Sequence, residues 1–118
     1  MSDNTSNLLL TAEDLLAGAS MTYDLSIPPE VLHPGSEAGD EHATLVRLRP
    51  LTLGTFLLIM KAAKEDTSLI PLLMIQESLV EPKLSLGQIR QMHLGLINFL
   101  IGHIRQISGL GGSEKKSL

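Results

Sequence analysis

The first candidates for metal binding and acid–base chemistry in this chain, which contains no cysteine, are four histidines and 13 acidic residues. His33 and His42 lie in an acidic stretch with Glu37, Asp40 and Glu41, which in principle offers ligands to a divalent cation. Their spacing matches neither a zinc-binding nor an EF-hand pattern. We therefore interpret this stretch as a solvated loop and expect no metal site.

The remaining candidates also lack catalytic partners. His93 and His103 are ten residues apart on a predicted helix, about 80° from sharing a face, so they cannot chelate one ion. Glu77 and Glu81 lie one helical turn apart, but no histidine, lysine or serine stands at a spacing that would activate a reaction. The sequence therefore predicts a protein that is not an enzyme and that has no catalytic residue, metal or cofactor.

Composition limits the class of protein further. A length of 118 residues suits a single domain, and 43% apolar but only 3% aromatic residues predict a Leu-, Ile-, Val- and Met-rich, mainly helical core. Nine basic residues against 13 acidic ones give a net charge of −4, which argues against nucleic-acid binding. No apolar run approaches the roughly 20 residues of a membrane span, so we expect no membrane partner.

The N-terminal part is predicted to hold a short helix and a β-hairpin. Residues 1–10 are expected to form a flexible arm, followed by a helix over 12–17 with Thr11 as its N-cap. Polar and apolar residues alternate over 21–27, and a second strand is predicted over 42–48, so residues 21–48 are expected to form an antiparallel hairpin. The proline- and acid-rich stretch 28–41 is predicted to be an exposed loop. Because an isolated hairpin is only marginally stable, it must lie against the helices.

The C-terminal part carries clear helix signals. Thr52, Thr67 or Ser68, and the capping box formed by Ser85 and Gln88 mark helix starts, while Pro82 and Gly109 mark helix ends. We therefore predict a mainly helical α+β fold, in which the short helix and the hairpin precede a three-helix bundle. The expected ranges are a single domain over 11–108, helices over 53–64, 69–80 and 86–107, and a flexible tail over 109–118.

The last predicted helix is apolar most of the way round from Met92 to Ile104, so it must be buried on more than one side. Two interpretations stay open: a fully internal central helix, or a helix that presents a face to a partner or to a second copy in a homo-oligomer. Phe99 is the strongest candidate anchor, because aromatic side chains are rare here and make large, rigid contacts. If this face proves to be core, the leucine-rich segment 8–16 is the alternative. The candidate partner-binding residues are Phe56, Met60, Met92, Leu96, Phe99, Ile101 and Ile104.

The order of these elements resembles that of a known family. A strand over 44–48, the segment V-R-L-R-P-L-T over 46–52, a first helix over 53–64, an acidic break, a second helix, Glu81-Pro82 and a terminal helix over 89–110 are similar to the tail assembly chaperones of contractile-tailed phages. Related small proteins occur in contractile injection systems. The first predicted helix places Leu53, Phe56, Leu57, Met60 and Ala63 on one side.

The resemblance implies a non-enzymatic helper in the cytoplasm of a bacterial host. Such a helper binds the apolar helices of a tape-measure or other tail protein until the tail tube polymerises around it. The alternative is a permanent structural subunit of the particle, such as a tube-end adaptor or a baseplate component. A small regulatory or antitoxin-like protein is a third class, disfavoured because no basic recognition helix is present.

Overall fold

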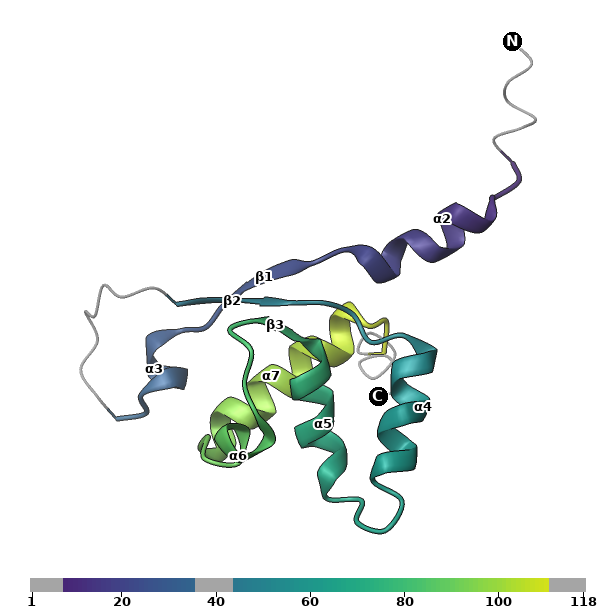
Figure 1. Cartoon of the computed structure of the whole chain (residues 1–118). Helices are drawn as coiled ribbons and strands as arrows, with labels where there is room; N and C mark the ends of the chain where they lie inside the picture. The colour runs from purple at the N-terminus through teal and green to yellow at the C-terminus, as the bar shows by residue number, and fades with distance from the viewer. Residues whose placement is uncertain (1–7, 36–43, 111–118) are drawn as a thin grey trace, which may run out of the picture.

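The computed structural model of the chain describes residues 8–35 and 44–110 (Figure 1). It confirms a mainly helical α+β fold with a small antiparallel sheet. The predictions for residues 1–7, for the loop over 36–43, which includes His42, and for the tail over 111–118 lie outside the described residues. In chain order the elements are α2 (Ala12–Leu16), η1 (Ala17–Ser20), β1 (Tyr23–Ser26), α3 (Pro29–Leu32), β2 (Leu45–Leu48), α4 (Leu53–Ala62), α5 (Leu69–Ser78), β3 (Leu79–Glu81), α6 (Leu86–Ile89) and α7 (Leu94–Ile107).

The predicted hairpin is confirmed by the pairing of β1 with β2. The two strands run antiparallel, with Tyr23 opposite Leu48 and Ser26 opposite Leu45. Asp24 lies directly opposite Arg47, and the Nε atom of Arg47 donates a 2.9 Å hydrogen bond to the Asp24 carboxylate. Such cross-strand pairs add to sheet stability and help to hold the register.

A third strand, β3, was not predicted from the sequence. We expected the second helix to continue to Val80, but α5 ends at Ser78 and the chain passes directly into β3. Strand β3 pairs antiparallel with β2, with Leu79 opposite Leu48, and gives the sheet order β1-β2-β3. The physical reason is that Pro82 disfavours helical geometry in the residue before it, while β2 offers an edge whose backbone groups need partners.

The core lies between one face of this sheet and the helices α5, α6 and α7, which Figure 1 shows on the same side of the sheet. Leu48 and Leu79 enter it from the sheet, while Ile75 is fully buried on α5. Leu100 and Ile104 enter from α7. The other members of the buried cluster are Ile27, Ile59, Met74 and Ile89.

The predicted helix over 86–107 is also corrected: it is two helices, α6 and α7, separated by a turn over 90–93. The capping box of Ser85 and Gln88 is present at the start of α6. His93 then begins a new helix, because its Nδ1 atom accepts a 3.3 Å hydrogen bond from the backbone N–H of Leu96. Since Nδ1 accepts, Nε2 carries the proton and donates a 2.7 Å bond to the carbonyl of Val31.

Part of the predicted 28–41 loop is helical in the structure, and the bond from His93 to Val31 holds this part against the body. Residues Pro29–Leu32 form α3, with a proline at its first position, where a missing N–H costs least. Val31 and Leu32 pack against the core cluster, and the bond from His93 attaches α3 to the start of α7. Residues 29–32, which the sequence predicts to be loop, are therefore part of the folded body.

Candidate protein-binding surface

Helix α4 exposes most of its apolar side chains to solvent. Thr52 caps it, accepting a hydrogen bond from the backbone N–H of Thr55. Only Ile59 within the helix, and Ala63 directly after it, are buried. Five large apolar side chains of the helix are exposed, and we call them the α4 face: Leu53 (72% exposed), Leu58 (67%), Leu57 (56%), Met60 (40%) and Phe56 (37%).

Two hollows flank the α4 face. One, of about 250 Å³, lies between the start of α4, α5 and the chain after α7, and its wall is mostly apolar. The other, of about 300 Å³, lies on the side where α4 meets α5. Helix α4 therefore stands as a ridge between two depressions that apolar side chains of a partner helix could fill. The first hollow is lined by Leu51, Thr52, Leu53, Phe56, Met74, Ser108 and Leu110, and the second by Thr55, Leu58, Ile59, Ala62, Leu73 and Glu77.

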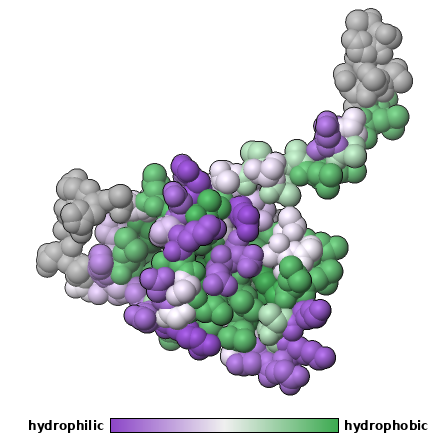
Figure 2. All heavy atoms as spheres, viewed as in Figure 1, coloured by the Kyte–Doolittle hydropathy of each residue, from purple (hydrophilic) through white to green (hydrophobic). Residues whose placement is uncertain are grey.

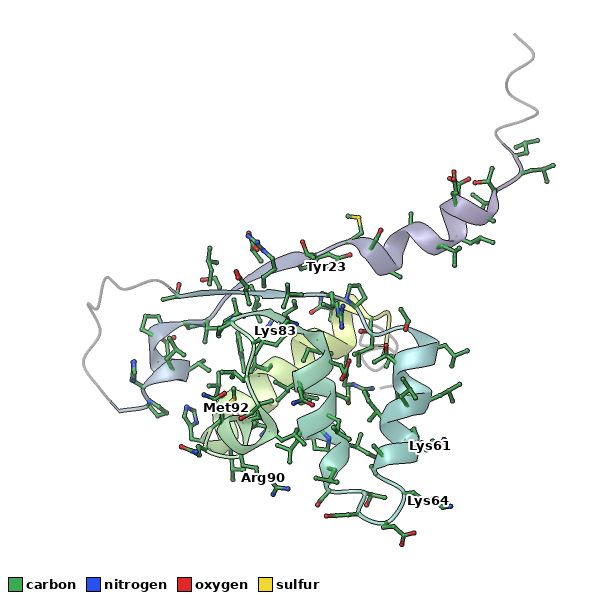
Figure 3. The ribbon with its side chains drawn as sticks, in the orientation of Figure 1. Tyr23, Lys61, Lys64, Lys83, Arg90 and Met92 are labelled. Atoms are coloured by element: carbon green, nitrogen blue, oxygen red, sulfur yellow. The ribbon has the colours of Figure 1, made fainter. Side chains whose placement is uncertain are left out.

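The structure distributes the predicted partner-binding residues over two different environments. Phe56 and Met60 lie on the α4 face. Met92, which lies beside α6 in Figure 3, is half-buried and packs against the core. Leu96, Phe99 and Ile101 on α7 are likewise half-buried against the core.

Phe99 and Ile104 show that α7 contributes mainly to the core. The ring of Phe99 packs against that of His103 at a tilt of 52°, with 4.6 Å between the ring centroids, so part of its surface is already in contact. Ile104 is completely buried, so in this structure it offers no surface to a partner, contrary to our expectation. Helix α7 thus serves largely as the central helix of the core, although Leu94 in its first turn is 80% exposed.

The candidate residues chosen from the sequence do not include Leu53, Leu57, Leu58 or Leu94, which the structure leaves exposed. The sequence does contain a signal for the exposure of α4. The large apolar residues of α4 are spread around most of the helix axis, the same pattern that drew attention to the last helix. Apolar residues on all sides of a surface helix leave some of them uncovered, and that argument applies more strongly to α4 than to α7.

A second exposed apolar element is the segment before the sheet, residues 8–21, which we call the arm. Every one of its residues is exposed, and Figure 1 shows it extending away from the body. Helix α2 within it is closed by a capping box, in which Thr11 Oγ1 accepts from the Asp14 N–H and the Asp14 carboxylate accepts from the Thr11 N–H. These bonds lower the pKa of Asp14, the backbone bond contributing most. The arm is therefore locally ordered but packs on little else.

The apolar side chains of both elements are visible in the space-filling view. Figure 2 shows hydrophobic colour on the arm and on the side of the body where α4 lies. Within residues 8–35 and 44–110, no three histidine, aspartate or glutamate side chains are placed to hold a metal ion. No helix of the described ranges is both long and apolar enough to cross a membrane. The prominent feature of this part of the chain is apolar surface suited to contact with another polypeptide.

Comparisons of the chain with protein-family models, with curated proteins and with solved structures gave no significant match.

Proposed function

We propose that this protein is a non-enzymatic helper in the assembly of a phage tail or a tail-like contractile particle, acting in the cytoplasm of the bacterial host. Its client is a tape-measure-type tail protein, whose apolar helices it shields before the tube forms. The observation that carries the proposal is the α4 face, on which a ten-residue helix presents five large apolar side chains to solvent. The resemblance in element order described above supports the choice of client.

The chemistry of the α4 face suits a helical client. An amphipathic helix binds by laying apolar residues at positions i, i+3, i+4 and i+7 into a complementary surface. The ridge of α4 between its two hollows offers that kind of surface. Met60 and Phe56 add one adaptable and one rigid anchor, a combination suited to client helices of varied sequence. Half-buried Leu96, Phe99 and Ile101 on α7 are secondary candidates that a client would reach only after some rearrangement.

The test is co-expression with the tape-measure-type protein, followed by affinity purification. Leu57→Asp combined with Leu58→Asp should abolish recovery of the client, because two charges would then be buried in the contact. Leu45→Asp is the matched control: Leu45 is 61% exposed but lies on β2, away from α4. If the α4 variant retains its client as well as the control does, the α4 face is not the binding site.

The alternative is a permanent subunit of the particle, and the extended arm is the observation that favours it, since projecting segments often join subunits. Mass spectrometry of purified particles separates the two functions. A helper should be absent from mature particles, whereas a structural subunit should be present at a fixed stoichiometry. Detection of the chain at fixed stoichiometry would replace the proposed function with this alternative.

A further inference from the structure

The outer edge of β1 carries backbone groups that have no strand to pair with. The sheet order is β1-β2-β3, so within the described part of the chain β1 has a neighbouring strand on one side only. The Ile27 N–H donates a 2.8 Å bond to the carbonyl of Thr44, which fixes the bonding pattern between β1 and β2. Because bonding alternates along an antiparallel strand, the N–H and C=O groups of Asp24 and Ser26 point away from β2, toward the open edge.

The two edges of the sheet differ in their protection against further pairing. Strand β3 has three residues, Pro82 directly follows it, and its register with β2 is irregular at Arg47 and Leu48. Short strands, prolines and bulges are means by which proteins block an open edge. On β1, neither residue whose N–H points outward is a proline or a lysine. The single charge of this strand, on Asp24, is held by Arg47 at 2.9 Å, so it does not stand unpaired at the edge.

The outer face of β1 is complementary to itself when two copies run antiparallel. If a two-fold axis passes beside Leu25, Asp24 of each copy lies opposite Ser26 of the other. The Ser26 hydroxyl makes only a 3.5 Å contact within its own chain, to Thr44. It can therefore donate to the facing Asp24 carboxylate, which has acceptor capacity beyond its bond from Arg47.

The inner face matches in the same register. Leu25, which packs against the edge of the core cluster, meets Leu25 of the second copy. Tyr23, which is 37% exposed in the single chain, lies opposite Ile27 of the second copy. Aromatic and β-branched side chains that face each other across strands stabilise a sheet. The Leu25 register therefore gives a favourable partner to each residue from Tyr23 to Ile27.

Two neighbouring registers are less favourable. An axis beside Asp24 would place the two Asp24 carboxylates directly opposite each other, and facing like charges destabilise a sheet. An axis beside Tyr23 would depend on residues that precede β1, which begins at Tyr23. The chemistry of the strand thus favours the Leu25 register.

We propose that two copies of this chain pair antiparallel through their β1 edges, about an axis beside Leu25, and join two three-stranded sheets into one continuous sheet. The N–H groups of Asp24 and Ser26 in each copy donate to the facing carbonyls of the other. Both copies use the same surface, which is the closed two-fold arrangement commonest among soluble oligomers. An extended client segment could add to the same edge, but a second copy brings the matching side chains in its own sequence. The pairing does not use the α4 face.

Sedimentation velocity of the full chain over a concentration series, with no client present, tests the dimer. The wild type should form a species of about twice the 12.8 kDa mass of one chain. Ser26→Pro removes an N–H that points to the second copy and none that bonds to β2, so it should weaken association at least about tenfold. Ser26→Ala is the matched control, because it keeps that N–H, and it should remain dimeric. Leu57→Asp with Leu58→Asp, on the α4 face, should dimerise like the wild type.

Cysteine cross-linking locates the axis, since the chain contains no cysteine of its own. Facing residues of a non-hydrogen-bonded pair have Cα atoms about 4.5 Å apart, which lies within disulfide range. Leu25→Cys should therefore form a covalent dimer under mild oxidation. Asp24→Cys should not, because its Cα atoms would be about 8 Å apart across the axis. Leu25→Cys leaves the backbone unchanged, so it decides the matter if Ser26→Pro fails to fold.

Several results would overturn the proposal. A wild type that stays monomeric over the whole series is one, and dimerisation that Ser26→Pro leaves at full strength is another. Loss of the dimer in the Leu57→Asp, Leu58→Asp variant would assign the contact to the α4 face instead. A covalent dimer of Asp24→Cys in place of Leu25→Cys would contradict the register. A monomeric wild type whose client is lost in Ser26→Pro would give the edge to the client, whereas the co-purification experiment tests the α4 face separately.

Discussion

The hydroxyl of Ser78 donates a 2.6 Å hydrogen bond to the backbone carbonyl of Arg49, while the N–H of Arg49 donates a 2.9 Å bond to the carbonyl of Ser78. Ser78 is the last residue of α5 and is completely buried, and Arg49 directly follows β2. The guanidinium of Arg49 adds a 3.0 Å bond to the carbonyl of Glu77. These bonds join the end of α5 to the end of β2, and so place β3 beside β2.

Ser78→Ala should lower the free energy of unfolding by about 1–2 kcal/mol, because it removes a buried hydrogen bond and leaves the Arg49 carbonyl with one fewer donor. Urea denaturation followed by circular dichroism measures this. Ser20→Ala is the control, since the Ser20 hydroxyl donates to the carbonyl of Ala17 in a fully exposed position. Equal losses in the two variants would mean that the Ser78 bond has no special structural role.

Ile104→Ala should lower the free energy of unfolding by about 2–5 kcal/mol, because it opens a cavity in the centre of the core. Leu58→Ala, which removes a 67% exposed side chain on α4, should change it by no more than about 0.5 kcal/mol. Thermal and urea denaturation of the two variants measure the difference. A large loss for Leu58→Ala would show that the α4 face is covered within the single chain.

Two glycines near the C-terminal end of α7 should respond to alanine in opposite directions. Gly109 has φ of +87°, and the bond from the Leu110 N–H to the Arg105 carbonyl closes the helix end around it. Alanine there should cost about 1–2 kcal/mol of stability. Gly102 lies within α7 with open space where a Cβ would stand, so alanine there should add up to about 1 kcal/mol. Melting temperatures that shift in the same direction would contradict this.

The lowered pKa of Asp66 predicts that the free energy of unfolding decreases in acid. Hydrogen bonds from the Ser68 hydroxyl, and secondarily from its N–H, lower the Asp66 pKa below its ordinary value of 3.8. The ionised form is therefore favoured by folding, so its contribution is present above pH 3.8 and is lost as the pH falls through the lower, folded-state pKa. In Ser68→Ala, NMR titration should show the Asp66 pKa moving up toward its ordinary value.

The stability measurement that accompanies the Asp66 titration compares the wild type with Asp66→Asn. The wild type should be more stable at neutral pH, and the difference should shrink once the pH is below both pKa values. A difference of the same size in strong acid would show that ionisation of Asp66 is not its source.

The helix caps are what the sequence by itself determined most reliably. Thr11, Thr52 and Ser85 were each predicted to begin a helix, and each accepts a hydrogen bond from the N–H three residues later. These contacts lie within a single turn, so the residues that make them are neighbours in the sequence. The α+β class and the β1–β2 hairpin followed in the same way from local alternation and periodicity.

The tertiary structure decided everything that needed a distant partner. Strand β3 exists because Leu79 meets Leu48, and the helix break at His93 depends on the carbonyl of Val31, 62 residues away. Which apolar helix lies inside was likewise undetermined, because periodicity shows that a face is apolar but not whether anything covers it. Helix α7 packs against both α5 and α3, whereas α4 packs on the body by one side only, and this difference in position left α4 as the exposed apolar surface.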